Sequence, residues 1–385
     1  MSGGFALGDV EIQSFLVDGS VDLRYKTASF DVYQDVKKPY HSVVIDVIDD
    51  GDTLNNVIQF NGGNTFDLSF SQPGQEPYKN SFVLTNVEKQ VTLQNQRVAR
   101  YNITGYSTHM VNFPKIQKAY KNQTGTDIIQ DLFSYLGASK GLVINDPSQG
   151  MFGTDKMPFN INGLSIYKAL RTAMLRCKSS SNDSSCYTFF ENNTNMVIDT
   201  LENMINNVSP VGTYFQKPLG KDFLQDNAEG QYNILNYREE AVVDGGATTQ
   251  STDMQTQSMD NFSQNLQKST TGSGVAATFL NIVYDTMRPP TFMNTVVPAR
   301  KSFAAKMDAQ ALTILVYLNP ALTVGAGFTV DTLSPPGSTD IETQDTVSGT
   351  YLITESRHSV KLIDQRKPQG LTSARGVNQN VAQSS

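Results

Sequence analysis

The sequence has 385 residues, more than a single hydrophobic core usually organises, so we expect two or three domains. Charged residues make up only 17% of the chain and the formal net charge is −7, which argues against a protein that binds duplex nucleic acid through a basic face. Asn, Gln, Ser, Thr and Gly take the place of the missing charge, and such uncharged polar side chains suit β-strands, loops and protein–protein contacts.

Residues 10–109 show the pattern of short β-strands. Apolar and polar side chains alternate at 43–47 and at 66–70, and turn sequences rich in Gly, Asp and Asn separate the apolar stretches. Further apolar stretches lie at 30–33, 57–60, 82–87 and 98–103. We therefore expect residues 1–112 to form an antiparallel β-barrel or sandwich.

Near residue 113 the period of the pattern becomes helical. Residues 126–136 place their apolar side chains on one helical stripe, with Thr126 as the expected N-cap and Gly137 as the expected stop. A second helix is predicted for 164–177, and packing against the neighbouring barrel is favoured over a contact with a partner or a membrane surface.

The strand pattern then returns. Apolar runs at 186–191 and 196–198 flank the turn Asn192-Asn193, which predicts a hairpin, so residues 113–205 are expected to form a helical and β-hairpin module.

A second β unit is predicted beyond this module, split between residues 206–243 and 296–364. Its strand signals lie at 232–237, 311–318, 328–330 and 350–356, with a helix at 299–307. Residues 244–295, rich in Gly, Ser, Thr and Gln, are expected to form a flexible insertion with a short helix at 278–287, and residues 365–385 a disordered tail.

Motifs for catalysis, cofactors or membrane insertion are missing from the sequence. It has no Walker loop, nucleophile elbow or dinucleotide glycine pattern, no signal peptide is visible, and the longest apolar run, 311–318, is far below the ~20 residues of a membrane span. A Ser-His-Asp triad is assembled in space, so spacing neither supports nor excludes one. We expect no enzyme activity, no catalytic, cofactor-binding or metal-binding residue, and no cofactor.

Four groups of residues are candidates for a site. The histidines His41, His109 and His358 lack a second histidine at metal-ligand spacing, so a structural role is favoured. The acidic residues at 46–52 fit a hairpin tip better than a calcium loop, and Glu239, Glu240 and Glu355 are carboxylates without a pattern. Cys177 and Cys186 are expected to be reduced, although oxidation could close the polar segment between them.

Three segments carry a family resemblance: residues 120–136, 158–205 and 311–360. In the second, a helix leads into the strand YTFFEN, an Asn turn and a return strand ending in TLENMI. The third contains Asn319-Pro320-x-Leu322-x-x-Gly325 before a strand and ends with the run from Tyr351 to His358. In their order and spacing they resemble the baseplate central hub protein of contractile-tailed (T-even-type) bacteriophages.

This resemblance implies an α+β, mainly β chain with two tail-tube-like antiparallel β-barrels, residues 1–112 and the split unit 206–243 with 296–364. Three copies would form a pseudo-hexameric ring that joins a sixfold tail tube to a threefold central spike and leaves a channel for DNA. The helical module and the insertion would lie outside the ring.

The resemblance also implies partners and a location. The chain would bind itself as a homotrimer, the central spike, and the tail tube or its initiator proteins, with baseplate wedge and tape measure proteins as further candidates. DNA would pass without specific binding, no membrane would be bound, and the protein would be part of the virion after assembly in the host cytoplasm. An acidic channel wall is the accompanying hypothesis.

Two other classes of function remain open. A β-rich cell-wall-degrading tail enzyme would need a catalytic constellation that the sequence does not display. A different baseplate or wedge protein, or a secretion-system spike component, would share the β-rich composition, although a fused spike should show a long repetitive β region at its C-terminal end.

Overall fold

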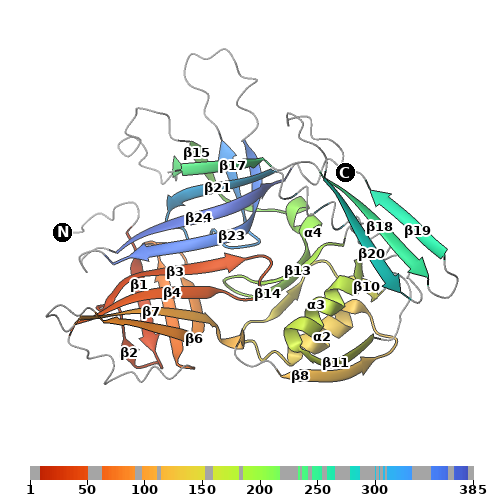
Figure 1. Ribbon diagram of the computed structural model, residues 1–385. Coiled ribbons are helices and arrows are strands. Elements are labelled where there is room, and N and C mark those ends of the chain that lie inside the picture. The colour runs from red at the N-terminus through yellow and green to blue at the C-terminus, as the bar shows by residue number, and fades with distance from the viewer. Residues whose placement is uncertain are drawn as a thin grey trace, which may run out of the picture.

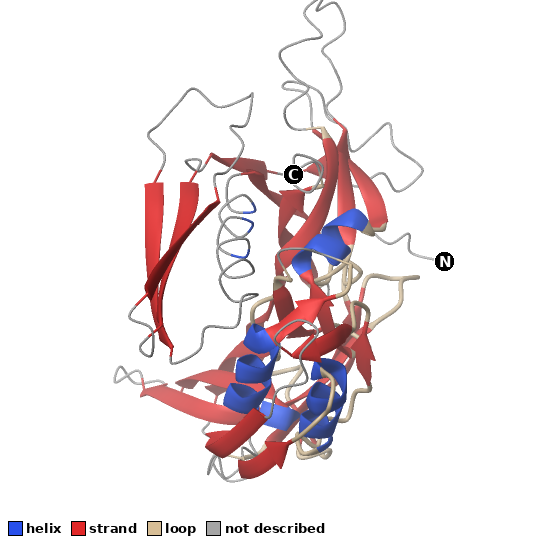
Figure 2. Ribbon diagram, turned by 90° about the vertical axis from the view of Figure 1, so that its right-hand side faces the viewer, coloured by secondary structure: helices blue, strands red, loops and turns tan. Residues whose placement is uncertain are grey.

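The computed structural model describes residues 9–50, 63–91, 98–110, 114–151, 159–181, 185–216, 310–331, 348–362 and 368–379, together with strands and single helical residues between 233 and 307. Strands predominate in these residues, and helices gather in one region (Figures 1 and 2). The predicted α+β, mainly β class is therefore confirmed. The predicted strand at 57–60 lies outside the described residues.

The first β unit (strands β1 to β7) is an antiparallel sheet built from one continuous part of the chain, in the strand order β3-β4-β7-β6-β5-β1-β2. In β3 (Thr27–Asp35), Phe30 and Val32 are buried while Asp31 and Tyr33 face outwards, as the two-residue period of a strand requires. Rings such as Phe15 and Phe66 fill the core. The other strands are β1 (Glu11–Val17), β2 (Val21–Asp22), β4 (Ser42–Asp50), β5 (Thr65–Ser71), β6 (Tyr78–Val91) and β7 (Val98–Ser107).

The second β unit (strands β15 to β17 and β21 to β24) is assembled from segments that lie far apart in the sequence. Strand β21 (Gln310–Tyr317) pairs with β17 on one side and with β24 on the other. The remaining strands are β15 (Pro210–Gln216), β16 (Asn233–Ile234), β17 (Asn236–Ala241), β22 (Gly327–Asp331), β23 (Gly349–Lys361) and β24 (Gln369–Asn378).

Strand β24 corrects the prediction that residues 365–385 are a disordered tail. It pairs with β21 along one edge and with β23 along the other, so it is an interior strand of the sheet. Its inward positions carry small side chains, among them Gly370, Thr372 and Gly376, which is why no apolar alternation marks this strand in the sequence.

The two β units share one sheet. The first residues of β23 pair with β22, and its last seven, Glu355–Lys361, pair with β3 of the first unit. We call this β23–β3 pairing the seam. In the described residues, no pairing joins the two edges of the first unit, and a single antiparallel bridge connects Asp9, just before β1, to Gln369 of β24. The described residues therefore form open sheets and not the closed barrels that were predicted.

The helical module (residues 115–206) packs two helices against small sheets. The helix α2 (Gly125–Ser134) begins at the N-cap Thr124 rather than at Thr126, because Thr124 and Asp127 form a reciprocal capping box. The predicted second helix and hairpin are confirmed as α3 (Ile166–Arg176), β13 (Tyr187–Glu191) and β14 (Met196–Thr200). The other elements are η1 (Thr108–Met110), just before the module, and β8 (Lys115–Tyr120), β9 (Leu142–Ile144), β10 (Ser148–Met151), β11 (Phe159–Ser165), β12 (Cys177–Ser179) and α4 (Leu201–Asn206).

The expected insertion contains strands. β18 (Gly245–Asp253) lies between β19 (Ser258–Gln264) and β20 (Thr278–Thr286), so the helix predicted at 278–287 is wrong. The β-branched and aromatic residues of TFLNIVYDT favour a strand. Of the helix predicted at 299–307, only Arg300, Phe303 and Met307 are described, and these are helical. Within the described residues, the helices are all too short or too polar to cross a bilayer.

Candidate functional site

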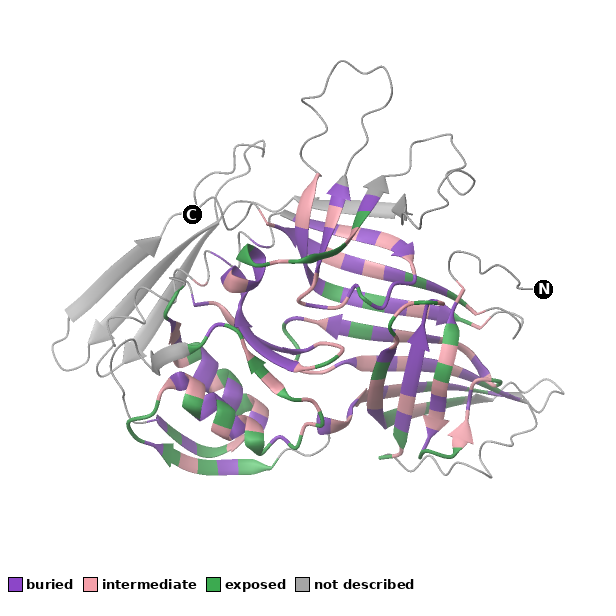
Figure 3. Cartoon of the chain, turned by 180° about the vertical axis from the view of Figure 1, so that it is seen from behind, coloured by how far each residue is buried: buried purple, intermediate pink, exposed green. Residues whose placement is uncertain are grey.

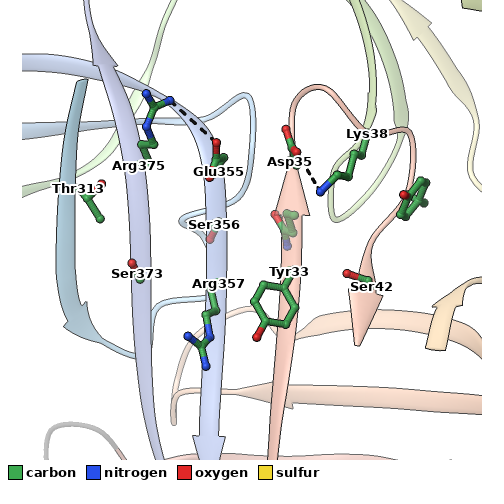
Figure 4. A pocket seen from close by; sticks show the side chains of 12 residues that line it. Tyr33, Asp35, Lys38, Ser42, Thr313, Glu355, Ser356, Arg357, Ser373 and Arg375 are labelled. Atoms are coloured by element: carbon green, nitrogen blue, oxygen red, sulfur yellow. Dashed lines mark ion pairs between the residues drawn. The ribbon is translucent and has the colours of Figure 1, made fainter. Parts of the chain in front are cut away.

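The outer face of the sheet at the seam carries an open groove of about 350 Å³ (Figure 4). Strands β3, β23, β24 and β21 form its floor, so both β units contribute to it. Most of the residues that line it are exposed or half-buried, whereas Gln34 and Ser356 are buried. Buried and more exposed positions alternate along the strands of the sheet (Figure 3). The lining residues are Tyr33, Gln34, Asp35, Lys38, Tyr40, Ser42, Thr313, Glu355, Ser356, Arg357, Ser373 and Arg375.

Four of the five charged side chains that line this groove are paired with one another. Lys38 lies 3.3 Å from Asp35, and Arg375 lies 4.0 Å from Glu355. Both partners in each pair come from the groove, so cations and carboxylates offset each other there. The groove is therefore a poor site for a ligand that binds through charge.

The same pairing continues across neighbouring strands. Arg357 of β23 contacts Asp31 of β3 at 3.0 Å, and Arg100 of β7 contacts Asp46 of β4. Cross-strand partners lie on the same face of a sheet, so these pairs and the groove belong to one surface. We call this surface, from β21 across to β7, the outer seam face.

A buried polar cluster lies where the hairpin β13–β14 meets the first β unit. Glu191, which is 1% exposed, accepts hydrogen bonds from Ser107 Oγ at 2.5 Å, His41 N at 3.0 Å and Asn80 Nδ2 at 3.1 Å. Ser107 and His41 bind Oε2, whereas Asn80 binds Oε1, and Lys140 Nζ lies 2.7 Å from the same Oε1. We call these five residues the junction cluster, and it satisfies a carboxylate that burial would otherwise destabilise.

The side chain of His41 is fixed as a neutral imidazole. Its Nε2 lies 2.9 Å from the backbone oxygen of Glu191, which can only accept, so Nε2 carries the proton and donates. Nδ1 then accepts from Tyr78 Oη at 2.8 Å. Burial lowers the pKa of His41 to about 4, against the opposing attraction of the Glu191 carboxylate.

Glu191 is held in its charged form. Burial alone would raise its pKa, but His41, Lys140 and His109 outweigh burial and lower that pKa to about 2. His109 Nε2 lies 4.0 Å from the carboxylate and donates to the backbone oxygen of Pro39 at 2.8 Å. The cluster thus holds a negative charge beside Lys140 and the neutral ring of His41.

This arrangement does not provide the groups of a nucleophilic centre. Ser107 Oγ donates to the carboxylate of Glu191 and not to a ring nitrogen of His41, so no imidazole is placed to take its proton. Ser107 is 1% exposed and His41 is fully buried, which leaves no space for a substrate. The cluster is suited to holding parts of the chain together.

The other residues weighed from the sequence are dispersed. His358 lies inside the first β unit with Nδ1 3.0 Å from Thr372 Oγ1, and burial lowers its pKa to about 3. Asp49, buried and 2.5 Å from Lys26, points away from Asp46, so these two carboxylates do not share a site. Within the described residues, no group of three His, Cys, Asp or Glu side chains is arranged to hold a metal ion.

The remaining candidates, the two cysteines and the three glutamates, form no further site within the described residues. Cys177 is buried, Cys186 is half-buried, and both thiols are reduced. Glu355 belongs to the paired charges of the groove, while Glu239 and Glu240 lie in β17, whose side chains are outside the described part of the chain. Sequence reasoning missed Glu191, although a lone carboxylate at the end of the apolar run YTFFE was a signal.

No protein-family model and no curated protein sequence matches the chain. Among solved structures, a tail protein of prophage MuSo2 from Shewanella oneidensis superposes with a TM-score of 0.60 at 11% identity, covering 97% of this chain and 99% of that one. The tail protein from Neisseria meningitidis superposes with a TM-score of 0.57 at 13% identity, covering 97% of both chains. A chain of the Francisella PdpA–VgrG complex gives 0.50 at 9% identity, and the match covers 98% of this chain but only 59% of that one. These likenesses show that the chain has the fold of phage tail proteins.

Proposed function

We propose that this chain, which has the fold of phage tail proteins, is a structural component of a contractile phage tail, namely the baseplate hub. The observation that carries the proposal is the pair of β units fused through one long strand, β23, within a chain whose whole length matches tail proteins. In this role the chain would build an assembly and would not be an enzyme.

The fused units support a ring of mixed symmetry. Three copies, each with two β units, would present six units around one axis and so would match a sixfold tail tube on one side and a threefold spike on the other. Open sheets also leave strand edges, which subunit contacts would cover. A homotrimer with a central channel is the assembly that we propose.

The outer seam face suits a channel wall that DNA passes without binding. Its ion pairs offset each other although the whole chain carries a net charge of −7. Cations that already pair with carboxylates displace few counterions from a phosphate backbone. The proposal is therefore a neutral, ion-paired wall, in place of the acidic wall that composition alone suggested.

The partners would be other tail proteins. We propose the central spike on one side of the ring and the tail tube or its initiator proteins on the other, with wedge and tape measure proteins as further contacts. The likeness to a chain of a PdpA–VgrG complex supports contact with a spike-like partner and also favours a second candidate, a secretion-system spike component. The location would be the virion tail baseplate, after assembly in the host cytoplasm.

Light scattering of the purified full-length chain, alone and mixed with its spike, tests the proposal. A mass of three times 42.3 kDa in either sample is expected, and electron microscopy should then show a ring with six lobes. A chain that stays monomeric with every tail partner would refute the hub. Muralytic activity of the isolated chain would favour the cell-wall-degrading enzyme instead.

A further inference from the structure

One strand of the helical module contacts all three parts of the chain. In β13, Phe189 belongs to the core of the module, whereas Phe190 belongs to the core of the second β unit. The next residue, Glu191, enters the junction cluster of the first β unit. The hairpin β13–β14 is therefore the place where the three parts meet.

The tip of the hairpin is bound from both sides as well. Asn193 Nδ2 donates to the backbone oxygen of Pro320 at 2.9 Å, and Asn193 Oδ1 accepts from Gln34 Nε2 at 3.3 Å. Thr323 Oγ1 in turn donates to Gln34 Oε1 at 2.6 Å. A Cβ added at Gly325 would lie 2.8 Å from the ring of Phe190, so the second β unit packs closely on the hairpin.

We infer that the buried charge of Glu191 holds the hairpin β13–β14, and with it the helical module, against both β units. Loss of this charge would release the hairpin before either β unit unfolds. The contacts of Phe190 are apolar and tolerate small shifts, whereas the carboxylate requires its donors in place. Removing it would take the charged acceptor from His41 N–H, Asn80 Nδ2 and Lys140 Nζ, all of which it holds in place. These donors would keep only neutral acceptors, Ser107 Oγ and the backbone oxygen of Asn192, and a buried lysine without its carboxylate is strongly destabilising.

The chain contains its own reporters for this release, because one cysteine of the module faces the second β unit and the other lies in the core of the module. Cys186 packs against the core of the second β unit, so separation of the hairpin exposes it. Cys177 is fully buried in the core of the module, so only unfolding of the module exposes it. Selective release and global unfolding therefore give different labelling patterns.

The experiment compares alkylation of both cysteines by iodoacetamide in the full-length wild-type chain and in Glu191→Ala, with peptide mass spectrometry to assign each site. We expect the alkylation rate of Cys186 to rise about a hundredfold, because the equilibrium between the docked and the released hairpin would shift by the same factor towards release. The rate of Cys177 should change less than about threefold. Asp131→Asn is the matched control, since it removes a half-exposed carboxylate paired with Lys118 within the module.

Lys140→Met gives a second variant in case Glu191→Ala does not fold. It keeps the carboxylate and removes only its cation, so it should also expose Cys186 selectively, to a smaller extent. Equal acceleration of both cysteines would show that Glu191 supports the whole fold and would overturn the inference. Unchanged labelling of Cys186 in a folded variant would overturn it too, because the hairpin would then be held without the carboxylate.

Discussion

The two β units reach similar sheets by different routes. In the first unit, most pairings join consecutive strands, so β5, β6 and β7 follow each other in both sequence and space, while β1–β5 and β4–β7 are its longer-range pairings. In the second unit, β15 pairs with β22 and β17 pairs with β21, across long stretches of chain. Local pairing needs little loop closure, whereas the second unit is complete only when the last strand, β24, has been added. The second unit should therefore be the more fragile one.

Removal of β24 is the severest test of this difference. Deleting residues 368–385 removes a strand that pairs on both edges, and the loss should exceed the ~5–15 kcal/mol by which a typical domain is stable. We expect an insoluble chain or one without a cooperative thermal transition by circular dichroism. Deleting only residues 380–385 is the control and should leave the transition unchanged. A folded 368–385 deletion would show that β24 is dispensable.

The same strand explains where the sequence was informative and where it was not. Strands such as β4 and β5 were predicted because bulky apolar residues alternate along them. β24 was missed because Gly370 and Gly376 face the core where larger side chains would collide with Leu318 and Phe328. Close packing by neighbours that are distant in sequence leaves no periodic signal.

The junction cluster was hidden for a related reason. His41 and Glu191 are 150 residues apart, so no local pattern connects them. The chain's family resemblance, carried by several segments in order, predicted the tail-protein fold, which the structural comparison supports. The N-cap Thr124 shows the usual limit of local patterns, because two threonines two residues apart compete for one helix start.

A single added methyl group should sharpen the comparison between the inner and outer faces of β24. At Gly376 a Cβ would lie 2.7 Å from both Phe328 and Tyr351, so Gly376→Ala should lower the free energy of unfolding by ~2 kcal/mol, as overpacking of a core typically does. Ser373→Ala, on the outward face of the same strand, should change it by less than ~0.5 kcal/mol. Urea unfolding of both variants measures the difference, and equal effects would contradict the assigned faces.

The buried histidines predict an acid sensitivity that belongs to the first β unit. The folded pKa values of His41 and His358 are about 4 and about 3, below the usual 6.5, so both rings stay neutral in the fold while the unfolded chain takes up protons. Stability should therefore be full above pH 6.5 and should fall as the pH drops towards 4, by at most ~1.4 kcal/mol per pH unit for each histidine.

Glu191 titrates at a lower pH than the two histidines, so its titration can be separated from theirs. Its folded pKa of about 2 lies below the usual 4.5, so its contribution is present above pH 4.5 and is lost only as the pH falls further. Urea unfolding of the wild type and of His358→Gln at pH 7, 6 and 5 should show a shallower pH dependence in the variant. Equal slopes would mean that His358 does not remain neutral in the fold.

The outer seam face should affect stability least and DNA binding most. Each of its pairs is solvent-exposed on at least one side, so Asp31→Asn together with Asp46→Asn should cost no more than ~1 kcal/mol. The same change leaves Arg357 and Arg100 without their carboxylates and turns a neutral face into a basic one. We expect this double variant to retard duplex DNA in a gel at low salt, with a retardation that disappears as salt rises, while the wild type does not.

Glu11→Gln together with Glu76→Gln is the control, since it makes the same change in net charge at two exposed acids outside this face and should retard DNA no more than the wild type. Retardation by both double variants would trace DNA binding to net charge alone and would remove the argument for a wall kept neutral by its ion pairs.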